Sequence, residues 1–147
     1  MQQTKLSTQD AALLGDVHFC AATGEFAISH LLPYVKTPAM RDELHAQRVL
    51  YGQKIRQTEE LLLPAGEETE PLSIMQKAGM KMALAMGGVR ASEEKIAKMM
   101  IRGATMGIVD VCHSLNQADD SSDLVRALSR DIVRDMQNAI ERLTCYL

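Results

Sequence analysis

The segment SEEKIAKMMIRGATMGIVDVCHSL, residues 92–115, gives the clearest indication of the fold. Ser92 can cap the free N–H groups of a helix, and Glu93 and Glu94 follow in the first turn, where negative charge is favourable. Apolar residues then recur at intervals of three and four, which is typical of one buried face of a helix. This face comprises Ile101, Ala104, Ile108, Val111 and Leu115, with Ala97, Met100 and Gly107 on adjoining turns. The pattern predicts one long helix that ends near residue 117.

Glycines interrupt this helix and one other. Each glycine inside a helix costs about 0.5–1 kcal/mol relative to alanine, so each needs a reason. Small residues let a neighbouring helix come close, and we expect close approach at Gly24, Gly103 and Gly107. The same glycines could instead open a groove for a ligand or another subunit. A membrane-packing role is excluded for 92–115, because charged residues such as Lys98 and Arg102 lie within it.

Composition limits the function classes. The chain has 147 residues, a length that predicts a single domain over 1–147. Its net charge of −3 is small, so nothing indicates a nucleic-acid or anionic-membrane partner. Aromatic residues make up 3% and there is no tryptophan, so the stacking platforms of single-strand binders are missing. Ten methionines favour helix and suit irregular packing.

The same features bear on location. The first residues, MQQTKLSTQD, are polar and do not form a secretory signal, and we expect no run long enough to span a bilayer. Cys20, Cys112 and Cys145 are odd in number and lack CxxC spacing. Reduced thiols are typical of the cell interior. We therefore expect a soluble, cytoplasmic protein that does not bind membranes.

Helical periodicity covers most of the chain, and no stretch alternates with a period of two. The predicted helices are 8–35, 39–63, 71–86, 92–117 and 122–146. Short turns at 36–38 and 118–121 make two antiparallel hairpins. Pro38 fits the first turn of its helix, and the Gly87-Gly88 pair is expected to end the short one rather than to cradle a phosphate.

The predicted hairpins are joined by about 28 residues that contain the short fifth helix. A connection of this length can cross the full length of the bundle, which leaves the second and third long helices parallel. We therefore predict an all-α fold, a ferritin-like four-helix bundle of two antiparallel hairpins with a long helical crossover.

The glycine-bearing helix MIRGATMGIVDVCHSLN and the closing helix DMQNAIERLTCYL, together with the two hairpins and the crossover, resemble small bacterial ferritin-like bundle proteins. Rubrerythrin-type and spore-coat-F-like proteins are more distantly similar. The resemblance covers most of the chain. It implies the bundle fold, and it implies no particular activity, because many such proteins have none assigned.

The best-known function of ferritin-like bundles is a di-iron or di-manganese site, which needs inward Glu-x-x-His pairs. This chain contains no Glu-x-x-His. The available substitutes are Glu25, His45, Asp110 and His113, where His45 and His113 each follow an aspartate by three residues. The predicted crossover places the two Asp-x-x-His pairs at opposite ends of the bundle. We therefore expect no bound cofactor, and keep an iron or manganese protein with these atypical ligands as the alternative.

Other chemistry has little support in the sequence. Cys112 and His113 are adjacent, and neighbours on a helix point about 100° apart, so they do not form a dyad.

The leading expectation is a non-enzymatic bundle that self-associates as a homodimer or higher homo-oligomer, through the crossover helix or the helix 92–117. Methionine-rich surfaces adapt well to partners. These methionines are Met75, Met82, Met86, Met99, Met100 and Met106. A third reading is a small-molecule pocket inside the bundle, walled by methionine and opened by the glycines.

Overall fold

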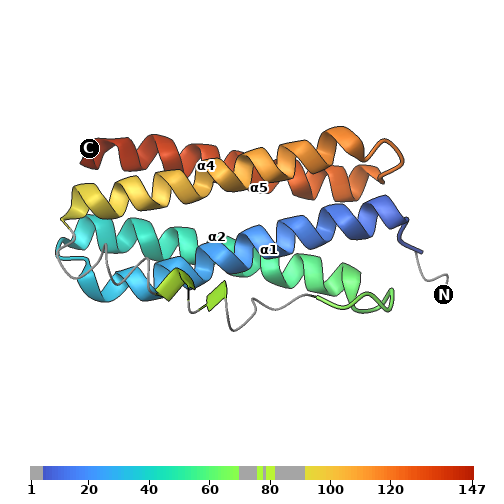
Figure 1. The fold of residues 1–147 in the computed structure, drawn as a ribbon, viewed down its shortest axis with the longest axis horizontal. Coiled ribbons are helices and arrows are strands. Elements are labelled where there is room, and N and C mark those ends of the chain that lie inside the picture. The colour runs from blue at the N-terminus through green and yellow to red at the C-terminus, as the bar shows by residue number, and fades with distance from the viewer. Residues whose placement is uncertain (1–4, 70–75, 78, 82–91) are drawn as a thin grey trace.

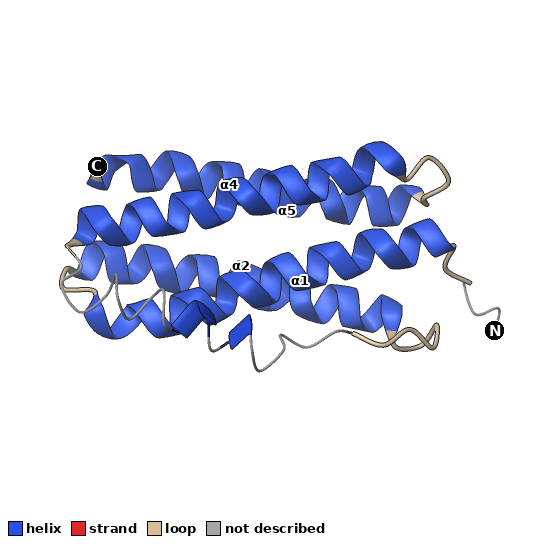
Figure 2. Ribbon diagram, in the orientation of Figure 1, coloured by secondary structure: helices blue, strands red, loops and turns tan. Residues whose placement is uncertain are grey.

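The structure is a computed structural model that describes residues 5–69, 76–77, 79–81 and 92–147. Four long helices account for most of them: α1 (Thr8–Leu31), α2 (Pro38–Leu62), α4 (Glu93–Gln117) and α5 (Asp123–Leu143). Short 3-10 turns follow α1 at Leu32–Tyr34 and α5 at Thr144–Tyr146. The described part of the chain contains no strand, so the prediction of an all-α fold is confirmed (Figure 2).

Side-chain caps set the helix starts. Ser7, Thr37, Ser92 and Ser122 each precede a long helix and accept a hydrogen bond from the N–H of the residue three positions later. Such a bond satisfies one of the N–H groups that a helix start leaves free. At Ser7 the cap is reciprocal, because the Asp10 carboxylate accepts from the Ser7 N–H. The predicted starts are therefore confirmed to within a residue or two.

Two predicted helix ends are corrected. The first helix ends at Leu31 and continues as a 3-10 turn to Tyr34, rather than as α-helix to residue 35. Pro33 explains the change, because its ring has no N–H to donate and clashes with the carbonyl four residues earlier. The last α-helix ends at Leu143, and its final residues form a 3-10 turn. Most of the predicted helix 71–86 lies outside the described residues, and so does the Gly87-Gly88 pair. The parts of this predicted helix that the structure describes, residues 76–77 and 79–81, are helical.

The helices form two antiparallel hairpins, α1–α2 and α4–α5, and α2 and α4 run in the same direction (Figure 1). A hydrogen bond joins the starts of α2 and α4, from the Thr37 N–H to Glu93 Oε1 at 3.0 Å. These two starts therefore lie at one end of the bundle. The turn between α4 and α5 lies at the other end.

Two more polar contacts tie the hairpins together at their ends. At the start of α1, Asp10 Oδ1 accepts a hydrogen bond of 2.8 Å from the Ser122 N–H at the start of α5. At the opposite end, Arg142 Nε near the end of α5 donates to Glu43 Oε1 on α2, also at 2.8 Å. One carboxylate, that of Asp10, thus serves the starts of two helices.

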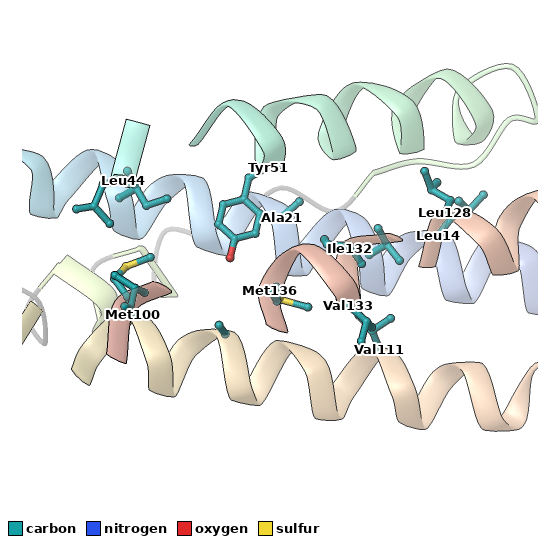
Figure 3. Close-up of a cluster of buried hydrophobic side chains, with 14 of the residues drawn as sticks. Leu14, Ala21, Leu44, Tyr51, Met100, Val111, Leu128, Ile132, Val133 and Met136 are labelled. Atoms are coloured by element: carbon teal, nitrogen blue, oxygen red, sulfur yellow. The ribbon is translucent and has the colours of Figure 1, made fainter. Parts of the chain in front are cut away.

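A continuous apolar core fills the space between the helices (Figure 3). On α4 the buried face is centred slightly differently from the prediction, because Ile101 and Ile108 are only partly buried. The fully buried large side chains of the core include Leu14, Ile28, Leu44, Val111, Ile132 and Met136. Helix α1 packs against α2, α4 and α5. It is therefore apolar on more than one side.

The composition of α1 corrects the expectation that no apolar run is long enough to span a bilayer. The 27-residue stretch Thr8–Tyr34 is long and apolar enough to cross a membrane by length and composition alone. Core helices of soluble bundles and N-terminal signal sequences have the same character. In this bundle the apolar sides of α1 face three neighbouring helices.

Candidate ligand-binding groove

A cavity of about 530 Å³ lies along the contact between α1 and α4. We call it the α1–α4 groove. Helices α2 and α5 each add one side chain to it. Its lining residues are Asp16, Phe19, Cys20, Thr23, Gly24, Ala27, Tyr51, Met99, Met100, Gly103, Ala104, Met106, Gly107, Asp110, His113, Ser114 and Met136. From Met99 to Ser114 the groove follows α4 for about 22 Å, at ~1.5 Å per residue.

Two sulfur atoms form part of the groove's inner wall. The Cys20 thiol on α1 donates to Met136 Sδ on α5, with 3.5 Å between the sulfurs. Gly107 on α4 lies directly against this pair. A Cβ at Gly107 would stand 2.6 Å from Cys20 Sγ and 3.0 Å from Met136 Sδ. Three helices therefore meet here because position 107 has no side chain.

Gly24 has the same role toward α2. A Cβ at Gly24 would stand 2.7 Å from Tyr51 Cε2, so the phenol ring lies flat against the α1 backbone. Tyr51 points from α2 into the space between the helices, on the side of Met136 (Figure 3). Its ring is 5% exposed and lines the groove.

Gly103 differs from the expectation of close helix approach. A Cβ there would meet no atom within 4 Å, and the residue is exposed. It lines the groove between Met99 and Met106, where the missing side chain leaves space. Met106 is 68% exposed and Phe19, across the groove on α1, is 40% exposed. The outer rim of the groove is therefore apolar and open.

The groove is polar at one end only. Asp16 on α1 and Asp110, His113 and Ser114 on α4 lie toward the α4–α5 turn, and the Ser114 hydroxyl donates to an Asp16 carboxylate oxygen. Met99, Met100 and Ala27 line the other end. Among the described residues that line the groove there is no lysine or arginine. The groove is thus amphipathic along its length, with negative charge at its polar end.

One residue that lines the groove has a buried hydroxyl with no hydrogen-bond partner among the described residues. Thr23 Oγ1 is inaccessible to solvent and has no hydrogen-bond partner among the described residues. The hydroxyl of Thr58, by contrast, donates to the Lys54 carbonyl oxygen at 2.8 Å. A buried hydroxyl without a partner costs free energy, and proteins seldom keep one without a reason. Thr23 has such a hydroxyl, and the residue lines the groove.

Burial also changes the acidity of two groups in the groove. Burial, with a smaller contribution from the Asp110 charge, raises the pKa of the Cys20 thiol to about 12. Burial raises the pKa of the Tyr51 phenol too, with added repulsion from Cys20 and Asp135. Both groups are therefore neutral near pH 7, and Cys20 is not a thiolate nucleophile there.

The four candidate metal ligands are not brought together. Glu25 and His45 lie about 10 Å along the bundle from the end where α2 and α4 begin, whereas Asp110 and His113 lie about 25–30 Å from it. Only Asp110 and His113 border the groove. Across residues 5–69, 76–77, 79–81 and 92–147 there is no group of three or more His, Cys, Asp or Glu side chains arranged to hold a metal ion.

A smaller cavity of about 300 Å³ lies beside α1, between Ala11 and the residues that follow α2. His18 borders it and is buried, with Nε2 3.1 Å from Glu59 Oε1 on α2. The partner of His18 is therefore Glu59 and not Glu25, although Glu25 is two turns away on the same helix. Gly15 also lines this cavity, and a Cβ there would meet nothing within 4 Å.

The sequence indicated part of this groove. The small-molecule hypothesis named methionines and glycines of α4, and Met99, Met100, Met106, Gly103 and Gly107 line the groove. Three inner residues, Cys20, Tyr51 and Met136, were not predicted to line a site, because each comes from a different helix. Gly24 was the available signal, since a mid-helix glycine indicates a bulky neighbour on a facing helix.

Comparison with known proteins gives a likeness of fold. The structure is similar to the crystal structure of a DUF305 fragment from Deinococcus radiodurans, with a TM-score of 0.74 over 96% of each chain. The two sequences are 19% identical over this alignment, so the likeness concerns the fold alone. No protein-family model and no curated protein matches the sequence.

Proposed function

We propose that this protein is a non-enzymatic binding bundle that takes an apolar small molecule in the α1–α4 groove. The observation that carries the proposal is the cavity of about 530 Å³, walled by methionine and widened at Gly103. Small-molecule sites are typically concave, about 300–1,000 Å³ in volume, and mostly apolar with a few polar groups. The groove meets each of these conditions.

The chemistry of the wall supports binding rather than catalysis. Methionine side chains are flexible and polarizable, so they adapt to ligands of different shape. The nucleophile nearest the groove, Cys20, is held as a neutral thiol by burial that raises its pKa to about 12. The groove offers shape and polarizability, and its thiol is not activated.

The test is titration with N-phenyl-1-naphthylamine, a neutral fluorescent probe whose emission rises in apolar sites. We expect saturable binding to the wild-type protein and its loss in Gly103→Leu. Leucine fits at this exposed position without a backbone clash, because a Cβ there meets nothing within 4 Å, and its side chain occupies the groove. Circular dichroism checks that the variant keeps its helix content and melting temperature.

The matched control is Gly15→Leu, which adds the same side chain at another open helical glycine. It lines the smaller cavity and not the groove. Binding that survives Gly15→Leu and disappears in Gly103→Leu supports the groove as the site. No saturable binding to the wild-type protein, or loss only in Gly15→Leu, contradicts the proposal.

Self-association is a second candidate, favoured by exposed apolar side chains on α4. Met106, which lines the groove, is 68% exposed, and Val109, three residues later on α4, is 61% exposed. Of the other methionines considered for an interface, Met100 is buried in the core, and Met75, Met82 and Met86 lie outside the described residues. A homodimer through α4 would cover Met106 and the groove's mouth together.

Sedimentation equilibrium over a concentration series tests this candidate. A dimer through α4 dissociates in the double variant Met106→Lys/Val109→Lys, because two buried charges oppose the contact. A wild-type protein that stays monomeric well above micromolar concentration contradicts self-association and leaves the binding proposal intact.

We further propose that the bundle is ferritin-like and works in the reducing interior of the cell. The parallel direction of α2 and α4, with two antiparallel hairpins, supports the first statement (Figure 1). The second is supported by Cys20, Cys112 and Cys145, which are all free thiols. Labelling the thiols in freshly denatured lysate before and after reduction tests the redox state, and full labelling without reductant is expected.

A further inference from the structure

The two ends of the α1–α4 groove differ in a way that specifies the charge of a ligand. The end toward the α4–α5 turn carries Asp16 and Asp110, and the other end is closed by Met99 and Met100. A molecule that lies along the groove therefore meets carboxylates at one end and methionine at the other. This inference rests on the binding function proposed above.

We propose that the groove selects cationic amphiphiles, small molecules with a protonated or quaternary amine at one end and an apolar body. The amine would lie at Asp16 and Asp110, and the apolar body would lie along Met99, Gly103 and Met106. The carboxylates are exposed at the rim, so the head group stays partly hydrated while the body is buried.

The charges around this end favour a cation. The groove's described lining includes no lysine or arginine that would neutralise the two aspartates. Asp110 takes part in no hydrogen bond or ion pair within the described residues, so its charge is available to a ligand. The negative charge of Asp110 also acts on the inner wall of the groove, because it helps to raise the pKa of the Cys20 thiol. Cys20 packs against Gly107, which lies one turn before Asp110 on α4.

An aromatic side chain also lines this part of the groove. Phe19 lies one turn after Asp16 on α1 and lines the groove with 40% of its surface exposed, and an aromatic face attracts cations. An anionic head group would face the two aspartates, and the described lining holds no lysine or arginine to compensate.

The experiment compares three molecules with one ten-carbon chain: decyltrimethylammonium, decanol and decanoate. Each competes with N-phenyl-1-naphthylamine below its micelle concentration, so the same site is measured every time. We expect decyltrimethylammonium to displace the probe at about one-tenth the concentration that decanoate needs, since one favourable charge contact is worth roughly that factor. Added salt reduces the difference, because the carboxylates are exposed.

The decisive variant is Asp110→Asn. It should remove most of the preference for the cation, measured within the variant as the ratio of the decanoate and decyltrimethylammonium concentrations that displace half of the probe. The matched control is Asp42→Asn on α2, which changes the net charge equally, lies outside the groove and has an exposed side chain. This control should keep the preference.

The outcomes separate the two proposals. Probe binding with equal competition by the three molecules overturns the charge preference and leaves the groove as a binding site. A preference that Asp42→Asn reduces as much as Asp110→Asn does also overturns it, since that result reports net charge alone. No probe binding at all contradicts the proposed function itself.

Discussion

The Cys20 thiol on α1 hydrogen-bonds to Met136 Sδ on α5, and Gly107 on α4 closes over the pair. Helices α1 and α5 are in contact here through two sulfur atoms, and α4 packs closely against them because Gly107 has no side chain. The same point is the inner wall of the α1–α4 groove. The depth of the groove and the stability of the bundle therefore depend on the same residues. Substitutions at these positions can separate an effect on the groove from an effect on stability.

Gly107→Ala should destabilise the protein by about 1–3 kcal/mol, because the new methyl group overlaps Cys20 Sγ in a packed core. Gly103→Ala should instead stabilise it by about 0.5–1 kcal/mol, because the position is open and alanine favours helix. Urea unfolding of the two variants measures both changes. Equal effects on stability would contradict the difference in packing.

Thr23→Val should raise the stability of the ligand-free protein by about 1 kcal/mol, because it removes a buried hydroxyl that has no partner among the described residues. The matched control is Thr58→Val. Its hydroxyl is fully buried and donates to the Lys54 carbonyl, so this change should cost about 1 kcal/mol. Thermal unfolding of the two variants without ligand gives the comparison, and a loss of stability in Thr23→Val would show that its hydroxyl is satisfied.

Alkaline pH should destabilise the protein partly through Cys20. Burial and then the Asp110 charge raise the pKa of this thiol from 9.0 to about 12, so the unfolded chain loses the proton first. The contribution is fully present below pH 9 and is lost as the pH rises toward 12, by at most about 1.4 kcal/mol per pH unit. Urea unfolding from pH 8 to pH 10.5 should show a shallower fall in Cys20→Ala. Parallel curves would mean that the thiol ionises as easily folded as unfolded.

Asp10→Ala should cost more than Ser7→Ala, at about 2 kcal/mol against about 1 kcal/mol. Ser7→Ala removes the side-chain cap of α1. Asp10→Ala removes the other half of that cap and also the acceptor for the Ser122 N–H at the start of α5. Hydrogen exchange should report faster exchange in the first turns of both helices for Asp10→Ala, and in α1 alone for Ser7→Ala.

The long helices were predictable because their signals are local. A hydroxyl cap, acidic residues in the first turn and a period of three to four specify a helix within its own sequence, as at Ser92 and Ser122. The ends were harder to predict, since Pro33 converts the last turn of the first helix to 3-10 form. That local effect was missed because the apolar pattern continues through it.

The site was less predictable because it depends on how helices face one another. Gly103 and Gly107 are one helical turn apart on α4 and look alike in the sequence. A Cβ at Gly103 would meet no atom within 4 Å, whereas a Cβ at Gly107 would overlap Cys20 Sγ. Likewise Met100 is buried and Met106 is exposed, although both belong to one methionine-rich stretch. Sequence periodicity gives the buried side of a helix to within about one residue, and a groove edge is decided within that margin.

The contacts that tie the helix ends have a consequence for how fast the groove can exchange its contents. Asp10 with Ser122, Thr37 with Glu93, and Glu43 with Arg142 all lie near the ends of the bundle, and the groove lies between them. Separating the hairpins would break these contacts, whereas the open rim needs only rotation of Phe19 and Met106, which takes picoseconds to nanoseconds. Association of a ligand with the groove would therefore not be limited by backbone motion, and differences in affinity among ligands would arise from their residence times.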